Sequence, residues 1–190
     1  MLIYLHGFNS SPASHKAQLL KRYMEEQGLG DQYCCPALPT LGLRAIAAIE
    51  AEIARHAFGS VTLLGSSLGG FYASYLAERH DLRAVLINPA VRPHEDLRAY
   101  LGTQRNLYTL QRYELTEEHL RQWEKLYLPT VQPWRYLLLV ETADEVLDYR
   151  EAVEKYRGAR QVVIEGGDHS LKSFPEHLPL ILEFAGTARA

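Results

Sequence analysis

The chain has 190 residues, of which 47% are hydrophobic and 23% are charged, and its formal net charge at pH 7 is −3. These values are typical of a soluble globular protein with a full core, so we expect residues 1–190 to form a single domain. The basic excess that nucleic-acid-binding proteins carry is missing, so nucleic acid is not an expected partner.

The cysteines and the N-terminal segment indicate a reducing compartment. Cys34 and Cys35 are adjacent, and adjacent cysteines rarely pair because the disulfide would be strained. The first residues show no basic segment followed by a long apolar run, and glycines and serines interrupt the apolar window at residues 61–77. We therefore expect a cytoplasmic protein without a membrane span.

Apolar runs alternate with helical patterns along the chain. Runs of strand length lie at residues 2–5, 33–37, 61–64, 83–88, 135–141 and 160–165. Helical patterns lie at residues 13–27, 43–58, 70–79 and 148–156, and a last one, with an irregular start at Pro175 and Pro179, ends near residue 184. This alternation predicts an α/β fold with a six-stranded parallel sheet, strand order 2-1-3-4-5-6, and helices on both faces.

One long segment, residues 91–133, breaks the alternation between the fourth and fifth strands. It contains two helical patterns, at residues 93–101 and 117–127, and Thr116 is a candidate N-cap for the second. We interpret the segment as a helical lid over the site, because long insertions at the carboxyl end of a strand are usually functional. A packed subdomain is the alternative, and the aromatic side chains of the segment fit an apolar pocket, a subdomain core or a dimer face.

The most informative motif joins the third strand to the next helix. It reads Gly65-Ser66-Ser67-Leu68-Gly69, which is a G-x-S-x-G sequence. A serine on such a tight strand-to-helix turn has its hydroxyl exposed at the end of the sheet, near the helix N-terminus. The motif predicts Ser67 as a nucleophile and the Leu68 N–H as a donor of an oxyanion hole. A glycine- and serine-rich connection without a catalytic role is the alternative.

Two later strands end where the partners of a nucleophilic serine belong. In this architecture an acid and a histidine follow the serine in that order, each after a strand. Asp144 follows the strand at residues 135–141, and His169 comes after a Gly-Gly turn behind the last strand. Glu145 and Asp148 are alternative acids, but Asp144 is nearest the strand end and Asp148 has the position of a helix N-cap.

The loop after the first strand supplies the second expected oxyanion donor, the Phe8 N–H, which follows Gly7. We interpret His6 in the same loop as a structural, hydrogen-bonding histidine. The other histidines fall on predicted helices and are expected at the surface: His15, His56, His80, His94, His119 and His177. The sequence contains no H-E-x-x-H motif or Cys/His cluster, so neither a metal ion nor another cofactor is expected.

Five stretches together resemble the YqiA-type bacterial esterases, a family of small α/β-hydrolases. They read LIYLHGFNSSP, LLGSSLGGFYA, INPAVRP, TADEVLDYREAV and EGGDHS, and they are spread over nearly the whole chain. The resemblance implies carboxyl-ester hydrolysis by a triad that falls on Ser67, Asp144 and His169. It also implies a shortened core without the antiparallel opening strands of larger α/β-hydrolases. The chain departs from the family at residues 106–110, where it reads NLYTL and relatives are expected to read NPYTG.

The predicted function is that of a serine esterase that hydrolyses carboxylic esters, with short acyl chains, through an acyl-enzyme on Ser67. A thioesterase acting on acyl-CoA or an acyl carrier is one alternative. A non-catalytic binding protein on a hydrolase scaffold is another. The expected partner is a small-molecule acyl ester or thioester.

Overall fold

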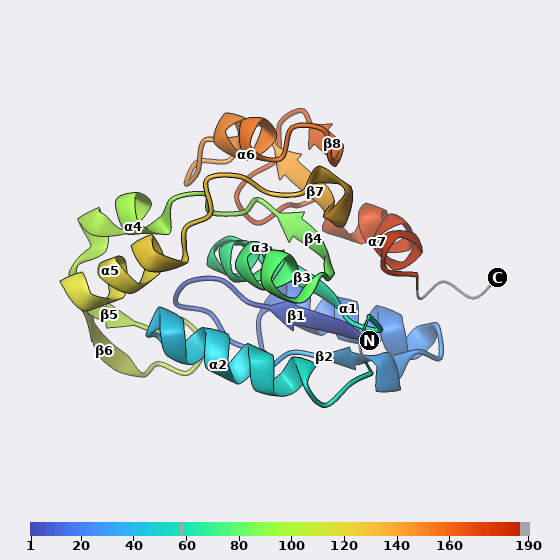
Figure 1. Ribbon diagram of the computed structural model, residues 1–190, viewed down its shortest axis with the longest axis horizontal. Coiled ribbons are helices and arrows are strands. Elements are labelled where there is room, and N and C mark those ends of the chain that lie inside the picture. Colours follow the sequence, from blue (N-terminus) through green and yellow to red (C-terminus); the bar gives the residue numbers. More distant parts are fainter. Residues whose placement is uncertain (58, 187–190) are drawn as a thin grey trace.

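A computed structural model describes residues 1–57 and 59–186 of the chain. At its centre lies a parallel sheet in the order β2-β1-β3-β4-β7-β8 (Figure 1), which confirms the predicted order. Its strands are Leu2–Leu5 (β1), Tyr33–Cys34 (β2), Thr62–Ser66 (β3), Arg83–Ile87 (β4), Tyr136–Glu141 (β7) and Arg160–Ile164 (β8). The chain winds one way from β1 to β2 and the other way from β3 onward. The topological switch point, where α/β proteins bind ligands, therefore lies between β1 and β3.

Helices cover both faces of the sheet, because successive strand residues point to opposite sides. On β1, Ile3 and Leu5 belong to one core and Leu2 and Tyr4 belong to the other. The first core also contains residues of α2, α3, α5 and α6, and the second contains residues of α1 and α7. These helices are His15–Glu26 (α1), Gly42–Ile53 (α2), Leu68–His80 (α3), Glu117–Leu126 (α5), Tyr149–Lys155 (α6) and Leu178–Ala185 (α7). Burial on both faces explains why the strands read as continuous apolar runs.

The irregular start of the last helix is confirmed. A 3₁₀ turn at Phe174–His177 (η4) precedes α7, and Pro175 and Pro179 lie in the first turns of these two segments, where a missing N–H is tolerated. Two further 3₁₀ turns, Gly30–Gln32 (η1) and Pro133–Arg135 (η3), lead into β2 and β7. The helix α2 ends at Ile53, before its predicted end at residue 58, which itself lies outside the described residues.

The insertion at residues 91–133 contains a strand pair in addition to helices. Its first helix is short, Pro93–Asp96 (α4), and the turn Arg98–Tyr100 (η2) follows it. The antiparallel strands Gly102–Arg105 (β5) and Arg112–Leu115 (β6) then form a hairpin. The sequence indicates only helices here, because GTQR and RYEL are too short and too polar to be recognised as strands. Thr116 caps α5 as predicted, and its N–H donates to His119 Nδ1 at 3.1 Å.

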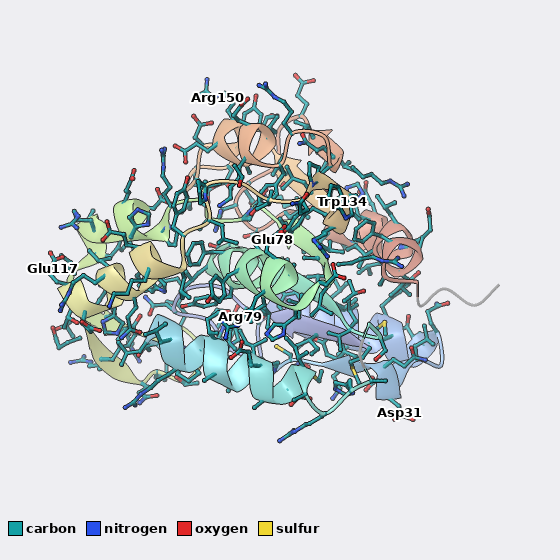
Figure 2. The ribbon with its side chains drawn as sticks, viewed as in Figure 1. Asp31, Glu78, Arg79, Glu117, Trp134 and Arg150 are labelled. Atoms are coloured by element: carbon teal, nitrogen blue, oxygen red, sulfur yellow. The ribbon has the colours of Figure 1, made fainter. Side chains whose placement is uncertain are left out.

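The insertion lies at the end of the sheet where the parallel strands have their carboxyl ends. Figure 1 shows α4, α5 and the hairpin together on one side of the molecule, away from the chain's N-terminus, where β1 begins. In Figure 2, Glu117 at the start of α5 lies far from Asp31, which comes just before β2. The insertion is therefore positioned over the carboxyl ends of the strands.

Hydrogen bonds join the hairpin to the loop after β1. Asn9 Nδ2 donates to Gln104 Oε1 at 3.1 Å, and the Tyr113 hydroxyl donates to Asn9 Oδ1 at 2.8 Å. At the hairpin turn, Asn106 Nδ2 donates to the carbonyl oxygen of Ser10 at 2.7 Å. The predicted oxyanion loop and the insertion thus form one hydrogen-bonded unit.

The departure at residues 106–110 places a leucine in a left-handed conformation. Leu110 has φ 61°, which strains any side chain with a Cβ, and its side chain is exposed. We expect Leu110→Gly to raise the free energy of unfolding by roughly 0.5–1 kcal/mol, since glycine removes the strain but adds freedom to the unfolded chain. Urea unfolding measures the change.

A matched control for this prediction is Leu107→Gly in the same turn. Leu107 is also exposed and has no positive φ, so glycine there only adds chain entropy to the unfolded state. It should lower the free energy of unfolding by roughly 0.5–1 kcal/mol. Two variants that shift stability in the same direction would contradict the strain at Leu110.

Candidate active site

Ser67 lies on a strained turn between β3 and α3. Its φ of 55° and ψ of −121° fall outside the regions that non-glycine residues normally adopt. Backbone hydrogen bonds hold this conformation: Ser67 N donates to the carbonyl of Ile87 at 3.0 Å, and Ala90 N donates to the carbonyl of Ser67 at 3.1 Å. The half-buried Ser67 side chain is therefore presented by a turn that β4 and its following loop fix on one side.

The glycines of the motif allow three backbones to pack closely. A Cβ on Gly69 would overlap the carbonyl group of Leu5 at the end of β1. A Cβ on Gly65 would overlap the backbone of Gly69 in the same way. Both positions therefore require glycine, and the turn lies tightly against the end of β1.

His169 is hydrogen-bonded to one of the three candidate acids. His169 Nδ1 lies 2.8 Å from Asp144 Oδ2, and since an ionised carboxylate can only accept, Nδ1 carries the proton. The other oxygen of Asp144 accepts from the N–H groups of Val146 and Leu147 at 2.8 and 2.9 Å. These three hydrogen bonds fix the Asp144 carboxylate and, through it, the orientation of the imidazole ring. The Nε2 atom of the ring does not contact the carboxylate.

The surroundings of Asp144 favour its ionised form. Its side chain is only 2% exposed. Burial raises the pKa of Asp144, but the hydrogen bonds from His169, Leu147 and Val146 outweigh burial and hold the pKa below its ordinary value of 3.8. The carboxylate therefore stays charged beside the imidazole at neutral pH.

The two alternative acids have other contacts. Glu145 Oε2 accepts from the backbone N–H of His169 at 3.0 Å, so it contacts the loop but not the ring. Asp148 is the N-cap of α6, as its position predicted, and its side chain accepts from Arg150 N at 3.0 Å. Of the three, Asp144 is the residue that the structure brings to the imidazole.

Ser67 and His169 line one cavity of ≈ 310 Å³ together with Phe8 and Leu68. Within the described residues, neither the Phe8 nor the Leu68 backbone N–H donates a hydrogen bond, so both donors are available. The same part of the chain holds no hydrogen bond between the Ser67 hydroxyl and His169. The cavity is otherwise mostly apolar, with contributions from Ala90, Leu97, Tyr100, Val146 and Leu147.

A second cavity of ≈ 340 Å³ also opens on Ser67 and His169. Its walls include the start of α1, the loop after β1 and the hairpin turn, and they are more polar than those of the first cavity. Ser67 and His169 thus lie where two cavities of different character meet.

Two buried polar residues that the sequence did not single out position the His169 loop. Glu141, at the end of β7, is 1% exposed and accepts from the N–H groups of Asp168, Lys172 and Ser173 and from the Ser173 hydroxyl, at 2.7–3.1 Å. Burial raises the pKa of Glu141, but these donors outweigh burial and hold it below its ordinary value of 4.5. The available signal was a carboxylate at the end of an otherwise apolar strand.

Asn88, directly after β4, is the second of these residues. Its side-chain amide donates to the carbonyl oxygens of Asp168 and His169, both at 3.1 Å, and its Oδ1 accepts from Glu141 N at 3.0 Å. Asn88 thus links the ends of β4 and β7 to the loop that carries His169.

The histidine predictions are confirmed in part. Buried His6 is hydrogen-bonded as expected, with Nε2 accepting from Leu38 N at 3.2 Å, and burial lowers its pKa. The surface position predicted for His119 is wrong: it is buried and lies against Tyr113 and Trp123 in the insertion. It replaces the glutamate or glutamine of a standard capping box, a role that helical periodicity does not reveal.

The described part of the chain offers neither a metal-binding cluster nor a membrane-spanning helix. Over residues 1–57 and 59–186, no group of three or more His, Cys, Asp or Glu side chains is arranged to hold a metal ion. In the same ranges, no helix has both the length and the apolar character needed to cross a bilayer. Cys34 and Cys35 are both free thiols.

Comparison with solved structures gives the fold. The mouse alpha/beta hydrolase domain-containing protein 10 superposes with a TM-score of 0.74 at 16% identity, covering 97% of this chain and 89% of that chain. A chain from the structural work on LipS and LipT, two metagenome-derived lipolytic enzymes, superposes with a TM-score of 0.70 at 16% identity, covering 98% of this chain and 93% of that chain. The monoacylglycerol lipase of Paleococcus ferrophilus gives 0.65 at 18%, covering 98% and 94%. The predicted α/β-hydrolase fold is confirmed.

Comparison with sequences gives the family. A protein of Pectobacterium atrosepticum, UPF0227 protein ECA1814, is 25% identical over 189 residues, covering 97% of this chain and 98% of the relative. The UPF0227 protein YcfP of Salmonella arizonae is 22% identical over 186 residues, with the same coverage. Residues 1–186 match the family described as "Uncharacterised protein family (UPF0227)". The chain therefore belongs to the UPF0227 family.

Proposed function

We propose that the protein is a serine esterase in which Ser67, His169 and Asp144 form the catalytic triad. The observation that carries the proposal is the Asp144–His169 hydrogen bond of 2.8 Å at the cavity that Ser67 also lines. The unpaired N–H groups of Phe8 and Leu68 beside the same cavity supply the oxyanion hole. Solved neighbours named as lipolytic enzymes and as a lipase support ester substrates.

In the proposed reaction, Ser67 Oγ attacks the acyl carbonyl while His169 Nε2 takes the hydroxyl proton. Asp144 holds the ring in the tautomer with the proton on Nδ1 and stabilises the imidazolium. The two backbone N–H groups donate to the developing oxyanion. His169 then protonates the leaving alcohol. In the second half of the reaction, His169 takes a proton from water, the water attacks the acyl-enzyme, and the acid is released as Ser67 regains its proton. Hydrogen bonds between a nucleophile and its base are often long in the free protein and tighten when substrate binds.

The first cavity fits the acyl chain of the substrate. Its walls include Leu68, Ala90, Leu97 and Leu147, which offer apolar surface to a hydrocarbon chain. Its volume of ≈ 310 Å³ lies at the lower end of the range of about 300–1,000 Å³ that small-molecule sites occupy. These features support short acyl chains.

Replacing the nucleophile tests the proposal directly. Ser67→Ala should lower kcat for p-nitrophenyl butyrate by up to about 10⁶-fold, because it removes the attacking oxygen. Ser66→Ala in the same motif is the matched control and should retain activity within about tenfold. Absence of hydrolysis by the unmodified protein, or equal hydrolysis by the Ser67→Ala variant, would refute the esterase. Matched oxygen and sulfur esters then decide between ester and thioester preference.

Removing the charge of Glu141 tests how the His169 loop is held. A carboxyl with a lowered pKa contributes stability above its unfolded pKa, and this contribution is lost as the pH falls from about 4.5 through the folded value. Glu141→Gln should therefore lower the free energy of unfolding at pH 7 by roughly 1–3 kcal/mol and flatten its decline below pH 4.5. Urea unfolding between pH 3 and pH 7 measures both; parallel curves for the two proteins would contradict the assignment.

Loosening the oxyanion loop should affect the transition state more than the bound substrate. Tyr113→Phe removes the hydroxyl that donates to Asn9 next to Phe8. We expect kcat to fall about 3- to 10-fold with KM within twofold, because the Phe8 N–H acts on the oxyanion. Tyr75→Phe, which removes a hydroxyl that contacts Arg79 on α3, is the control and should change neither constant. A rise in KM alone would contradict the prediction.

A further inference from the structure

The second cavity carries polar groups for which the proposed reaction has no use. Ser14, His15 and Lys16, from the start of α1, line it on one side, and Leu107 and Tyr108 of the hairpin turn line it on the other. It opens on the same Ser67 and His169 as the apolar cavity. A substrate bound at Ser67 can therefore reach these groups with the part that does not enter the apolar cavity.

Ser14 has a buried hydroxyl with no partner. It occupies the N-cap position of α1, but its side chain makes no capping hydrogen bond. The residue is only 7% exposed, and its Oγ has no hydrogen-bond partner within the described residues. A hydroxyl in this state is unfavourable unless a bound group completes its hydrogen bonds.

Lys16 is a half-buried cation without a carboxylate partner. Its Nζ donates to the carbonyl oxygen of Ser170 at 2.7 Å, and it takes part in no ion pair among the described residues. Burial lowers its pKa to about 8, against the opposing effect of Asp168 and two other carboxylates. Asp168 is itself paired with Lys172 at 2.8 Å, and the other two, Glu141 and Asp144, are satisfied in the His169 loop.

The start of α1 adds a favourable field for negative charge. This 12-residue helix has no acidic residue in its first turn. The N–H groups of His15, Lys16 and Ala17 donate no hydrogen bond within the described residues, so the positive end of the helix dipole is uncompensated. Ser14, His15 and Lys16 line the same cavity. The N-terminal end of α1, a buried hydroxyl without a partner and an ammonium group are therefore neighbours there, and all three favour an anion.

The apolar cavity disfavours a negatively charged group. The carboxyl group in its wall is Asp96, whose pKa burial raises to about 6, so it is negative at neutral pH. An ester with an anionic group would therefore bind with its hydrocarbon chain in the apolar cavity and its anion in the second.

We propose that the second cavity binds a carboxylate or phosphate on the leaving-group side of the substrate, held by Lys16 and Ser14. The natural substrates are then esters or thioesters whose alcohol or thiol part carries negative charge. This inference rests on the proposed esterase function, of which it names the substrate class.

Three butyrate esters test the selectivity at constant ionic strength. Their alcohols are 4-nitrophenol, which is uncharged in the ester, 4-hydroxybenzoate and 4-hydroxyphenyl phosphate. Lys16→Met should raise KM for the two anionic esters about 10- to 100-fold and leave the 4-nitrophenyl ester within twofold. Lys21→Met is the matched control, since Lys21 lies on the same helix and pairs with Glu25 at its surface; it should leave all three unchanged. An effect on the carboxylate ester alone or the phosphate ester alone supports the site and identifies its anion.

Ser14→Ala separates a binding role from a structural one. An N-cap serine that holds a helix is needed for stability, whereas the unpartnered Ser14 hydroxyl should be removable without a fall in Tm. KM for the anionic esters should rise several-fold. A lower Tm with unchanged KM would overturn the role of Ser14.

Anion binding without turnover distinguishes the failure of this inference from that of the esterase. Inorganic phosphate and acetate should raise the Tm of the Ser67→Ala protein, and adding Lys16→Met should abolish the rise. If no ester is hydrolysed but the Lys16-dependent rise is present, the esterase fails and the anion site stands. If esters are hydrolysed and Lys16→Met affects all three equally, or none, the anion site fails and the esterase stands.

Discussion

The close approach of three backbones at the switch point is the constraint on which the site depends. Gly69 packs against the carbonyl of Leu5, and Gly65 packs against Gly69, with no room for a Cβ at either position. The end of β1, the end of β3 and the start of α3 are thereby held together. Because Phe8 follows β1 and Ser67 follows β3, this contact sets the distance between the loop that carries Phe8 and the turn that carries Ser67. Steric fit, and not a polar interaction, aligns these two parts of the site.

The loop that carries His169 is held by buried polar groups. The segment between β8 and η4 has no regular structure, so its N–H groups need partners other than a helix or strand. Glu141 accepts several of them, and Asn88 binds the carbonyl oxygens on the other side of the loop. Both residues are anchored in the sheet, at the ends of neighbouring strands. A loop without secondary structure thereby presents His169 in a defined position.

The sheet, its order and the positions of Ser67, Asp144 and His169 could be predicted because apolar runs identify strands and these candidate residues follow strand ends. The hairpin could not be predicted, since its strands are short and polar and the loop that it contacts, at Asn9 and Ser10, lies nearly a hundred residues earlier in the chain. The role of Glu141 was hidden for the same reason, as its partners lie about thirty residues later and become neighbours only in the fold. The lack of a hydrogen-bond partner for the Ser14 hydroxyl among the described residues results from packing, which sequence periodicity does not reveal.

The bonds between the hairpin and the loop after β1 couple the position of the insertion to that of Phe8. A lid that moved on an independent hinge would leave Phe8 undisturbed. In this chain, lifting the hairpin would break the contacts to Asn9 and Ser10 as well, and the oxyanion loop would lose its support. Displacement of the insertion would thus also change the cavity that Phe8 and Ser67 line. The cavity wall and the Phe8 N–H would change position together.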